Sequence, residues 1–342
     1  MDTFSHIGVI GAGAWGTALA QTLAHTASTQ PQAARITLWA YEDTCAHTIN
    51  HEHMNALYLP DIALNPSIQA TSNIKDMLAC ELLLIVTPAQ HMRSILSPIA
   101  KDIPNNHPII LCSKGIERRS LHLMSEVLSY IIPQSIAAVL SGPSFAIDVA
   151  KGLPTALTLA CSDKDMGQKI QASIAAPTFR PYLTDDIIGA EIGGAVKNVL
   201  AIAAGMVLGQ NLGRSAHAAL ISRGFAEMSR LGLAMGAKER TLTGLCGLGD
   251  LVLTCSSETS RNMSCGMALG RGERLEDILS RRQSVTEGVA SAPAIIKLAQ
   301  KYNVDMPICE AVQTILSGQE NVRTAMQKLL SRAYKTEHSP HI

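Results

Sequence analysis

A glycine-rich turn near the start of the chain constrains its fold more than any other feature. Residues Gly11–Gly16 read GAGAWG, which matches the pattern G-x-G-x-x-G. The turn follows the apolar run His6–Ile10 and leads into the helical pattern Trp15–Ala27, so a strand, a tight turn and a helix are predicted. Glycine at these positions allows the turn, the approach of a pyrophosphate and close packing of the helix on the sheet. The turn therefore predicts a dinucleotide site, and a glycine-rich turn without a ligand is the alternative.

Apolar runs and helical patterns alternate through the first half of the chain. Further strand-like runs are Arg35–Trp39, Leu82–Val86, Pro108–Cys112, Ile136–Leu140 and Thr155–Cys161. The helical patterns between them are Ala89–Ala100, Leu121–Tyr130 and Lys164–Ala175. This rhythm predicts an α/β fold with a mostly parallel, doubly wound sheet of the Rossmann type.

The pattern changes near residue 185, where strand-like runs nearly vanish. Helices are predicted over Ile192–Leu212, Ala216–Met235, Gly288–Tyr302 and Pro307–Leu316. A length of 342 residues suits roughly two domains. We therefore expect a dinucleotide-binding domain over residues 1–186, an all-helical domain over 187–334 and a flexible tail over 335–342.

Charge is scarce in this chain and it is balanced. Charged residues make up 16% of the sequence, against about 25% in typical globular proteins. A chain so poor in charge buries much of its surface, either in large cores or in a subunit interface. The formal net charge is zero and no basic run occurs, so nucleic acid is not an expected partner.

The eight cysteines and the apolar segments indicate where the protein acts. No C-x-x-C pair occurs, so the cysteines are expected to be small buried residues in a reducing compartment, with no metal site. The first residues lack the basic segment of a signal peptide. The apolar run Asn198–Gly213 is too short and too polar to span a bilayer. A soluble, cytoplasmic protein is expected.

One lysine lies in an apolar, helical segment. Residues 192–205 read IGGAVKNVLAIAAG, and Lys197 is the only charged residue from Ile192 to Gly213. Asp250 is likewise the only charge between Thr241 and Ser257. Burying either charge alone is costly, so we expect the two to meet, directly or across a substrate. The alternative is that each caps a helix or extends to solvent independently.

Polar residues follow several predicted strands. Ligands of open α/β sheets bind outside the carboxyl ends of the strands, where the segments Thr87-Pro88, Ser113-Lys114-Gly115 and SGPSFA (141–146) are found. Lys114 is either placed to reach an anionic substrate or the cofactor, or is a solvated loop lysine. After the second strand, Glu42 and Asp43 occur without a nearby Arg or Lys, which favours NAD over NADP. The same acids also suit the start of the next helix.

Two polar segments stand out in the second half. Ser260-Arg261-Asn262 combines a guanidinium with hydroxyl and amide groups, as a phosphate or carboxylate pocket requires, although a lone triplet is a weak signal. Glu287, in the segment VTEG (285–288), is either a first-turn acid of the next helix or a group that reaches the nicotinamide carboxamide. Its position alone does not decide between the two.

Together, these motifs identify a family. GxGxWG, SKGIE, SGPSFA, GGAVKN, GLGDLVLTC, SRN and VTEG, in this order, resemble the NAD(P)-dependent sn-glycerol-3-phosphate dehydrogenases of bacteria, from about residue 6 to 333. The resemblance implies a Rossmann domain followed by an all-helical domain similar to the C-terminal domain of 6-phosphogluconate dehydrogenase, and a homodimer. It also implies reversible reduction of dihydroxyacetone phosphate to sn-glycerol 3-phosphate with NAD(P)H, which supplies glycerophospholipid biosynthesis.

The same resemblance implies a role for individual residues. Lys197 would be the proton donor and acceptor, and Asp250 would belong to the catalytic centre. The substrate would contact Lys114, Gly142, Ser144, Lys197, Asn198, Asp250, Thr254, Ser260, Arg261 and Asn262. The cofactor, NAD or NADP, would contact Gly11, Gly13, Ala14, Trp15, Gly16, Tyr41, Lys114, Ala146, Arg261, Val285 and Glu287.

Two departures from the family pattern bear on these roles. Tyr41, followed by Glu42, stands where many relatives carry His or Arg, which argues against a strict NADP preference. Ser215-Ala216-His217 stands where relatives usually show Asn-x-Arg or Asn-x-Lys, and His217 is expected to be structural.

Rival functions fit the sequence less well. Reductases of hydroxy acids or ketopantoate share the two-domain pattern, but the SRN and SGPSFA segments argue against them. A nucleotide-sensing or scaffold protein without catalysis is disfavoured because Lys197 and Asp250 are both present.

Overall fold

The chain folds into two compact units. The computed structural model describes residues 3–28, 34–281 and 285–333. Within these ranges, one unit comprises residues up to 117 together with 122–191, and the other comprises 118–121 together with residues from 192 onward. The predicted tail, 335–342, lies outside the described residues.

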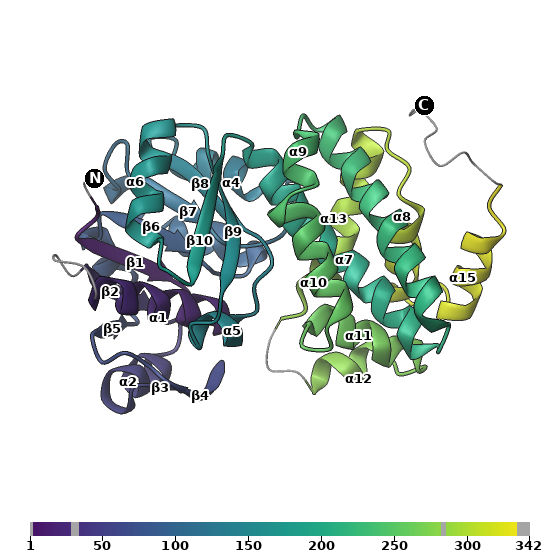
Figure 1. The fold of residues 1–342 in the computed structure, drawn as a ribbon, viewed down its shortest axis with the longest axis horizontal. Helices are drawn as coiled ribbons and strands as arrows, with labels where there is room; N and C mark the ends of the chain where they lie inside the picture. Colours follow the sequence, from purple (N-terminus) through teal and green to yellow (C-terminus); the bar gives the residue numbers. More distant parts are fainter. Residues whose placement is uncertain (1–2, 29–33, 282–284, 334–342) are drawn as a thin grey trace. The chain divides into compact units, whose positions relative to one another are not determined.

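An eight-stranded sheet forms the centre of the first unit (Figure 1). Its strands are β1 (His6–Ile10), β2 (Arg35–Trp39), β5 (Ile68–Thr71), β6 (Leu82–Ile85), β7 (Pro108–Leu111), β8 (Ile136–Ser141), β9 (Thr155–Cys161) and β10 (Phe179–Thr184). They lie in the order β10-β9-β8-β7-β6-β1-β2-β5. Neighbouring strands are parallel except β8 and β9, which are antiparallel. The predicted doubly wound, mostly parallel sheet is confirmed.

Helices and short turns connect these strands. The connecting elements are α1 (Ala14–Ser28), α2 (Asp43–Glu52), η1 (Ile74–Ala79), η2 (Ala89–His91), α3 (Met92–Leu96), η3 (Ala100–Asp102), α4 (Met124–Ile131), α5 (Ala146–Ala150) and α6 (Lys164–Ile174). Of these, α1, α2, α4 and α6 pack against strands of the sheet. Strands β6 and β7 are buried at every position because they lie in the middle of the sheet, which explains their unbroken apolar runs.

The strand order places the glycine turn at a point where ligands bind. From β1 the chain extends the sheet to β2 and β5 on one side, and it later returns to add β6, β7 and β8 on the other. The order therefore reverses between β1 and β6, and such a reversal opens a crevice at the carboxyl ends of the strands. The glycine turn leaves β1 at this position.

Several elements were not predicted. Strands β3 (Met54–Asn55) and β4 (Leu59–Ala63) form a small antiparallel hairpin outside the main sheet. Strand β10 carries Pro181, which opposes a strand prediction, but β10 is an edge strand that pairs only with β9, and edges tolerate proline. The predicted helix Ala89–Ala100 is instead the short series η2, α3 and η3, and α3 ends just before Pro98.

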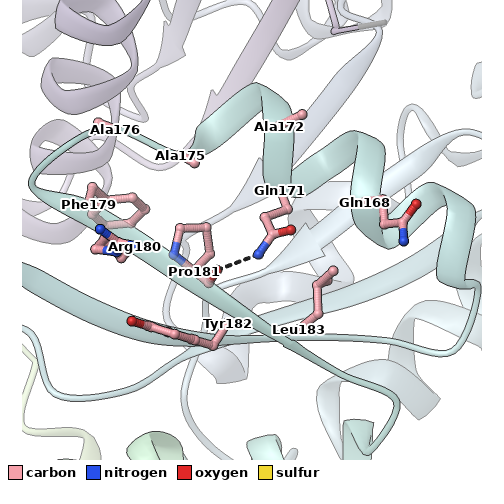
Figure 2. Close-up of a pocket in the computed structure, with 10 residues that line it drawn as sticks. All are labelled: Gln168, Gln171, Ala172, Ala175, Ala176, Phe179, Arg180, Pro181, Tyr182 and Leu183. Carbon is pink, nitrogen blue, oxygen red and sulfur yellow. Dashed lines mark hydrogen bonds between the residues drawn. The ribbon is translucent and has the colours of Figure 1, made fainter. Parts of the chain in front are cut away.

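A surface hollow lies between α6 and the edge strand β10 (Figure 2). It is lined by Gln168, Gln171, Ala172, Ala175, Ala176, Phe179, Arg180, Pro181, Tyr182 and Leu183. The side chain of Gln171 turns toward the strand and donates a hydrogen bond from Nε2 to the carbonyl oxygen of Pro181 at 2.7 Å. The hollow contains none of the predicted site residues, and this contact ties helix and strand together.

The described elements of the second unit are helical. They are α7 (Ile187–Gly209, in this unit from Ile192), α8 (Gly213–Ala234), α9 (Glu239–Leu242), the π-helical turn η4 (Leu245–Gly249), α10 (Asp250–Ser256), α11 (Arg261–Gly270), α12 (Leu275–Ser280), α13 (Glu287–Lys301), α14 (Pro307–Leu316) and α15 (Val322–Leu330). The all-helical architecture predicted for the second half is confirmed. Helix α7 is long and apolar enough to cross a membrane by length and composition alone, but 83% of its most apolar window is buried inside the protein. Such burial is typical of a core helix.

Glycines let α7 and α11 cross at close range. A Cβ atom added at Gly205 would lie 2.0 Å from the carbonyl oxygen of Met263, and one at Gly266 would lie 1.9 Å from that of Ile202. Each helix thus presses a glycine against the backbone of the other. No larger residue fits at either position without moving a helix.

We expect Gly266→Ala to lower the free energy of unfolding by about 1–3 kcal/mol or more, because the added methyl group meets rigid backbone. Gly224→Ala is the matched control, since its Cβ would approach only the end of the Leu200 side chain, at 2.8 Å, and that side chain can rotate. Urea denaturation of both variants measures the difference. Equal destabilisation of the two would contradict this account of the helix crossing.

Candidate active site

The glycine turn of the first unit has a geometry that suits a dinucleotide. Gly11 has φ 120°, and a Cβ atom at Gly16 would lie 1.8 Å from the carbonyl oxygen of Gly11. At Gly13 an added Cβ would meet no atom within 4 Å, so the backbone there faces open space. Helix α1 begins at Ala14, and the N–H groups of a first helical turn lack partners within their helix. The buried Nε1 of Trp15 also has no hydrogen-bond partner. The turn can therefore hold a pyrophosphate.

The segments after β6, β7 and β8 are joined by hydrogen bonds. Lys114 Nζ donates to the carbonyl oxygen of Gly142 at 3.2 Å, and Ser144 Oγ donates to the same oxygen at 3.1 Å. Ser113 Oγ donates to the carbonyl oxygen of Thr87 at 2.5 Å. Helix α5, which begins at Ala146, packs against α1. The structure thus brings Lys114, Gly142 and Ser144 together at the carboxyl edge of the sheet.

Tyr41 and Glu42 follow strand β2 at the same edge of the sheet. The Tyr41 side chain is 77% exposed, and its ring meets that of Trp39 edge-on with 6.2 Å between centroids. Glu42 occupies the N-cap position of α2, yet its side chain makes no capping hydrogen bond. Its Oε1 accepts a hydrogen bond from the hydroxyl of Tyr58 instead, at 3.0 Å.

In the second unit, Lys197 is buried and paired. Its Nζ lies 2.5 Å from Asp250 Oδ1 and donates a second hydrogen bond to Thr254 Oγ1 at 2.9 Å. The Lys197 side chain is 8% exposed and that of Asp250 is fully buried. Asp250 and Thr254 are one turn apart in α10, so both face the lysine. The prediction that Lys197 and Asp250 meet is confirmed, and the contact is direct.

Cys255 lies next to this pair, and His217 in turn contacts Cys255. Burial raises the pKa of the Cys255 thiol to about 12, so this neighbouring group stays neutral. His217, buried in α8, contacts the carbonyl oxygen of Cys255 through Nε2 at 2.8 Å and holds the end of α10. A structural role was expected for His217, and this contact agrees with it.

A chain of amide hydrogen bonds extends from α7 to α13. Asn198 Nδ2 donates to the carbonyl oxygen of Gly194 at 3.3 Å, and Asn198 Oδ1 accepts from Asn262 Nδ2 at 2.9 Å. Asn262 Oδ1 then accepts from the backbone N–H of Gly288 at 2.9 Å. The predicted contact residues Asn198 and Asn262 are therefore linked to each other, and Asn198 directly follows Lys197 in the sequence.

The remaining predicted residues of this unit lie at helix starts. Ser260 Oγ accepts from the backbone N–H of Met263 at 3.2 Å and caps α11, whose first residue is the exposed Arg261. Val285 is 46% exposed and precedes α13. Glu287 is the first residue of α13, and its buried Oε2 has no hydrogen-bond partner. Burial raises the pKa of Glu287 to about 7, while the charge of Arg261 opposes the shift.

One residue at the glycine turn was missed by the sequence analysis. Asn55, which is 1% exposed, donates from Nδ2 to the carbonyl oxygen of Ala12 and to Thr17 Oγ1, both at 2.8 Å. It thereby fixes the shape of the turn from 43 residues away. A single asparagine in a short hairpin gives no signal of such a contact.

Comparisons with known proteins agree on one family. The model of the NAD-dependent glycerol-3-phosphate dehydrogenase N-terminus matches residues 6–167, and that of the C-terminus matches residues 186–327. The chain is 57% identical over 337 residues to glycerol-3-phosphate dehydrogenase (NAD(P)+) of Maricaulis maris. This match covers 98% of this chain and 99% of the relative. The enzyme of the same name from Caulobacter vibrioides is 55% identical over 335 residues, with 98% and 99% covered. A crystal structure of glycerol-3-phosphate dehydrogenase from Coxiella burnetii matches with a TM-score of 0.90 at 37% identity, covering 96% of this chain and 99% of that one.

Alanine at two positions of the turn should separate ligand binding from folding. We expect Gly13→Ala to keep the stability of the protein but to weaken NADH binding by about tenfold or more, because its methyl group fills the space that faces the backbone. Gly16→Ala should also lower the melting temperature, because its Cβ would collide with the carbonyl oxygen of Gly11. Calorimetric titration with NADH and thermal unfolding measure the two effects. Unchanged NADH affinity in Gly13→Ala would contradict the assignment of the turn.

Proposed function

Because the chain belongs to the NAD-dependent glycerol-3-phosphate dehydrogenase family, we propose that its buried Lys197–Asp250 pair carries out the proton transfer of the family reaction. The enzyme reversibly reduces dihydroxyacetone phosphate to sn-glycerol 3-phosphate with NAD(P)H, which supplies glycerophospholipid biosynthesis. The observation that carries the proposal is a buried lysine on an apolar helix. Its ammonium group is held by Asp250 and Thr254.

The chemistry of ketone reduction explains why a lysine is needed. Bound NAD(P)H supplies the hydride. Negative charge then develops on the carbonyl oxygen, and an ammonium ion at Lys197 both stabilises this charge and donates the proton. Asp250 balances the ammonium and fixes the position of Nζ, and Thr254 holds it from a second side. In the reverse direction the neutral amine accepts the proton from the alcohol.

We propose that the substrate phosphate binds at the start of α11. Arg261 is exposed there, and a guanidinium can give two parallel hydrogen bonds to a phosphate. The N–H groups of the first turn add positive potential at the same end of the helix. Asn198 and Asn262 link α7 to α11, so the proposed phosphate site is joined to the helix that carries Lys197. Ser260 and Asn262 complete this proposed phosphate site. In the first unit, Lys114, Gly142 and Ser144 are the proposed substrate contacts.

The proposed cofactor contacts divide into two groups. Around the glycine turn they are Gly11, Gly13, Ala14, Trp15, Gly16, Tyr41, Lys114 and Ala146. In the helical unit they are Arg261, Val285 and Glu287. The open space at Gly13 and the partnerless Nε1 of Trp15 support the first group, and the partnerless Oε2 of Glu287 supports the second.

We also propose the domain limits and the state in which the protein works. A cofactor domain over 1–186 and a substrate domain over 187–334 are supported by the gap between the two family models, which falls between residues 167 and 186. A homodimer is supported by the low charged content of 16%. A cytoplasmic location is supported by eight free, buried cysteines, as expected in a reducing compartment.

Replacement of Lys197 tests the proposal. We expect the wild type to oxidise NADH or NADPH in the presence of dihydroxyacetone phosphate, and Lys197→Ala to lower kcat by about 10²–10⁴-fold, the usual contribution of a general acid. The dissociation constant for NADH should not change, because Lys197 transfers the proton and is not among the proposed cofactor contacts. Lys301→Ala removes an exposed lysine at the end of α13 and is the control. Near-normal turnover in Lys197→Ala would show that this lysine is only a structural partner of Asp250.

The affinity for NADH should depend on the charge of Glu287. The carboxyl group is protonated below its pKa of about 7 and charged above it. A carboxylate is purely an acceptor and suits the N–H groups of the nicotinamide carboxamide, so NADH affinity should rise as the pH increases through about 7. Glu287→Gln should flatten this dependence, whereas Glu276→Gln, at an exposed first-turn acid of α12, should preserve it. A wild-type affinity that is constant across this range would contradict the role of Glu287.

A further inference from the structure

The β3–β4 hairpin connects the two strand ends that carry proposed cofactor contacts. On one side, Asn55 donates two hydrogen bonds to the glycine turn, to the Ala12 carbonyl oxygen and to Thr17 Oγ1. On the other side, the Tyr58 hydroxyl donates to Glu42 Oε1, just after β2. The hairpin itself is braced, because Asn55 Oδ1 accepts from the backbone N–H of Tyr58 at 3.3 Å. One network therefore runs from the pyrophosphate turn to the end of β2.

Glu42 has the position and the charge of an acid that recognises the ribose of the cofactor. An acid after the second strand accepts from the ribose 2′-hydroxyl of NAD and disfavours the 2′-phosphate of NADP. No lysine or arginine occurs from Ile36 to Glu52 that would attract this phosphate. Glu42 stands at the helix start, but its side chain makes no capping hydrogen bond, so the carboxylate is not committed to α2.

Tyr58 is suited to hold this carboxylate. Its side chain is half-buried, and burial together with the hydrogen bond to Glu42 raises its pKa, so the phenol keeps its proton and remains a donor. A glutamate side chain has several rotatable bonds, and an exposed one would turn freely in water. A hydrogen bond to one carboxylate oxygen restricts that motion, and the other oxygen can still accept a hydrogen bond.

We propose that Tyr58 is a positioning residue for cofactor specificity, which fixes the Glu42 carboxylate beside the ribose and makes the protein favour NAD(H) over NADP(H). Asn55 sets the hairpin against the glycine turn, so that the carboxylate stands at a fixed place relative to the bound pyrophosphate. The inference rests on the proposed cofactor site in the first unit, and it is independent of Lys197 and of the reaction.

Direct binding measurements on the full chain test this inference. The dissociation constants of NADH and NADPH would be measured by nicotinamide fluorescence for the wild type, Tyr58→Phe, Glu42→Gln and the double variant. We expect the wild type to prefer NADH. Glu42→Gln should shift the ratio of the two constants toward NADPH by about tenfold, the usual weight of a hydrogen bond to a charged group, and Tyr58→Phe should shift it in the same direction by less. In the Glu42→Gln background, Tyr58→Phe should add no further shift, because Tyr58 acts through Glu42.

Tyr130→Phe is the matched control for Tyr58→Phe. Tyr130→Phe removes the same hydroxyl from a tyrosine that is 70% exposed on α4, and it should leave both constants unchanged. Equal weakening of NADH and NADPH by Tyr58→Phe would make the hairpin a scaffold only and overturn the proposal. An unchanged ratio in Glu42→Gln would overturn it even if Tyr58→Phe did not fold. Because no turnover is needed, a protein that discriminated between the cofactors but did not reduce dihydroxyacetone phosphate would refute the proposed function and leave this inference standing.

Discussion

A buried ammonium ion needs a partner of opposite charge. In the second unit this requirement joins two helices, α7 and α10, through Lys197 and Asp250. Lys197 is the only charge in a long apolar stretch of α7, and its partner Asp250 is fully buried at the first position of α10. Removing either partner of such a pair would leave an uncompensated charge, at a cost of about 3–5 kcal/mol. The pair therefore fixes α10 against α7, and His217 holds the other end of α10 through the Cys255 carbonyl oxygen. The same contacts that stabilise the core hold the proposed proton donor, Lys197, at a defined point.

Glycine residues allow close backbone contacts in both units. In the first unit, Gly16 lies so close to the Gly11 carbonyl oxygen that no Cβ fits, which gives the turn its shape. In the second unit, Gly205 and Gly266 bring the backbones of α7 and α11 into contact. That close crossing is what allows the Asn198 and Asn262 side chains to reach each other. Glycine thus shapes the proposed cofactor turn in one unit and the spacing of the proposed site residues in the other.

The sequence predicts those features that depend on a local pattern. It also predicts contacts without which a buried charge would cost free energy. The glycine turn is a short contiguous motif, and a lone charge in an apolar segment must find a partner, so the Lys197–Asp250 contact could be foreseen. Strand β10 could not, because Pro181 opposes a strand except at a few places such as an edge, and the edge position of β10 follows only from the complete sheet. The Asn262–Asn198 and Asn55–Ala12 contacts join residues 64 and 43 positions apart, and no local pattern marks them.

Three glutamates whose pKa is raised by burial differ in whether the fold satisfies their carboxyl oxygens. Burial raises the pKa of Glu191, Glu227 and Glu287 alike to about 7. Glu191 accepts from the backbone N–H and hydroxyl of Ser125 at the start of α4, and Glu227 accepts from two backbone N–H groups at the start of α14. Both are satisfied by the fold, whereas Glu287 retains a buried oxygen without a partner. A buried acceptor left unsatisfied is costly, and its presence beside the Asn262 network is explained if a bound molecule provides the missing donor.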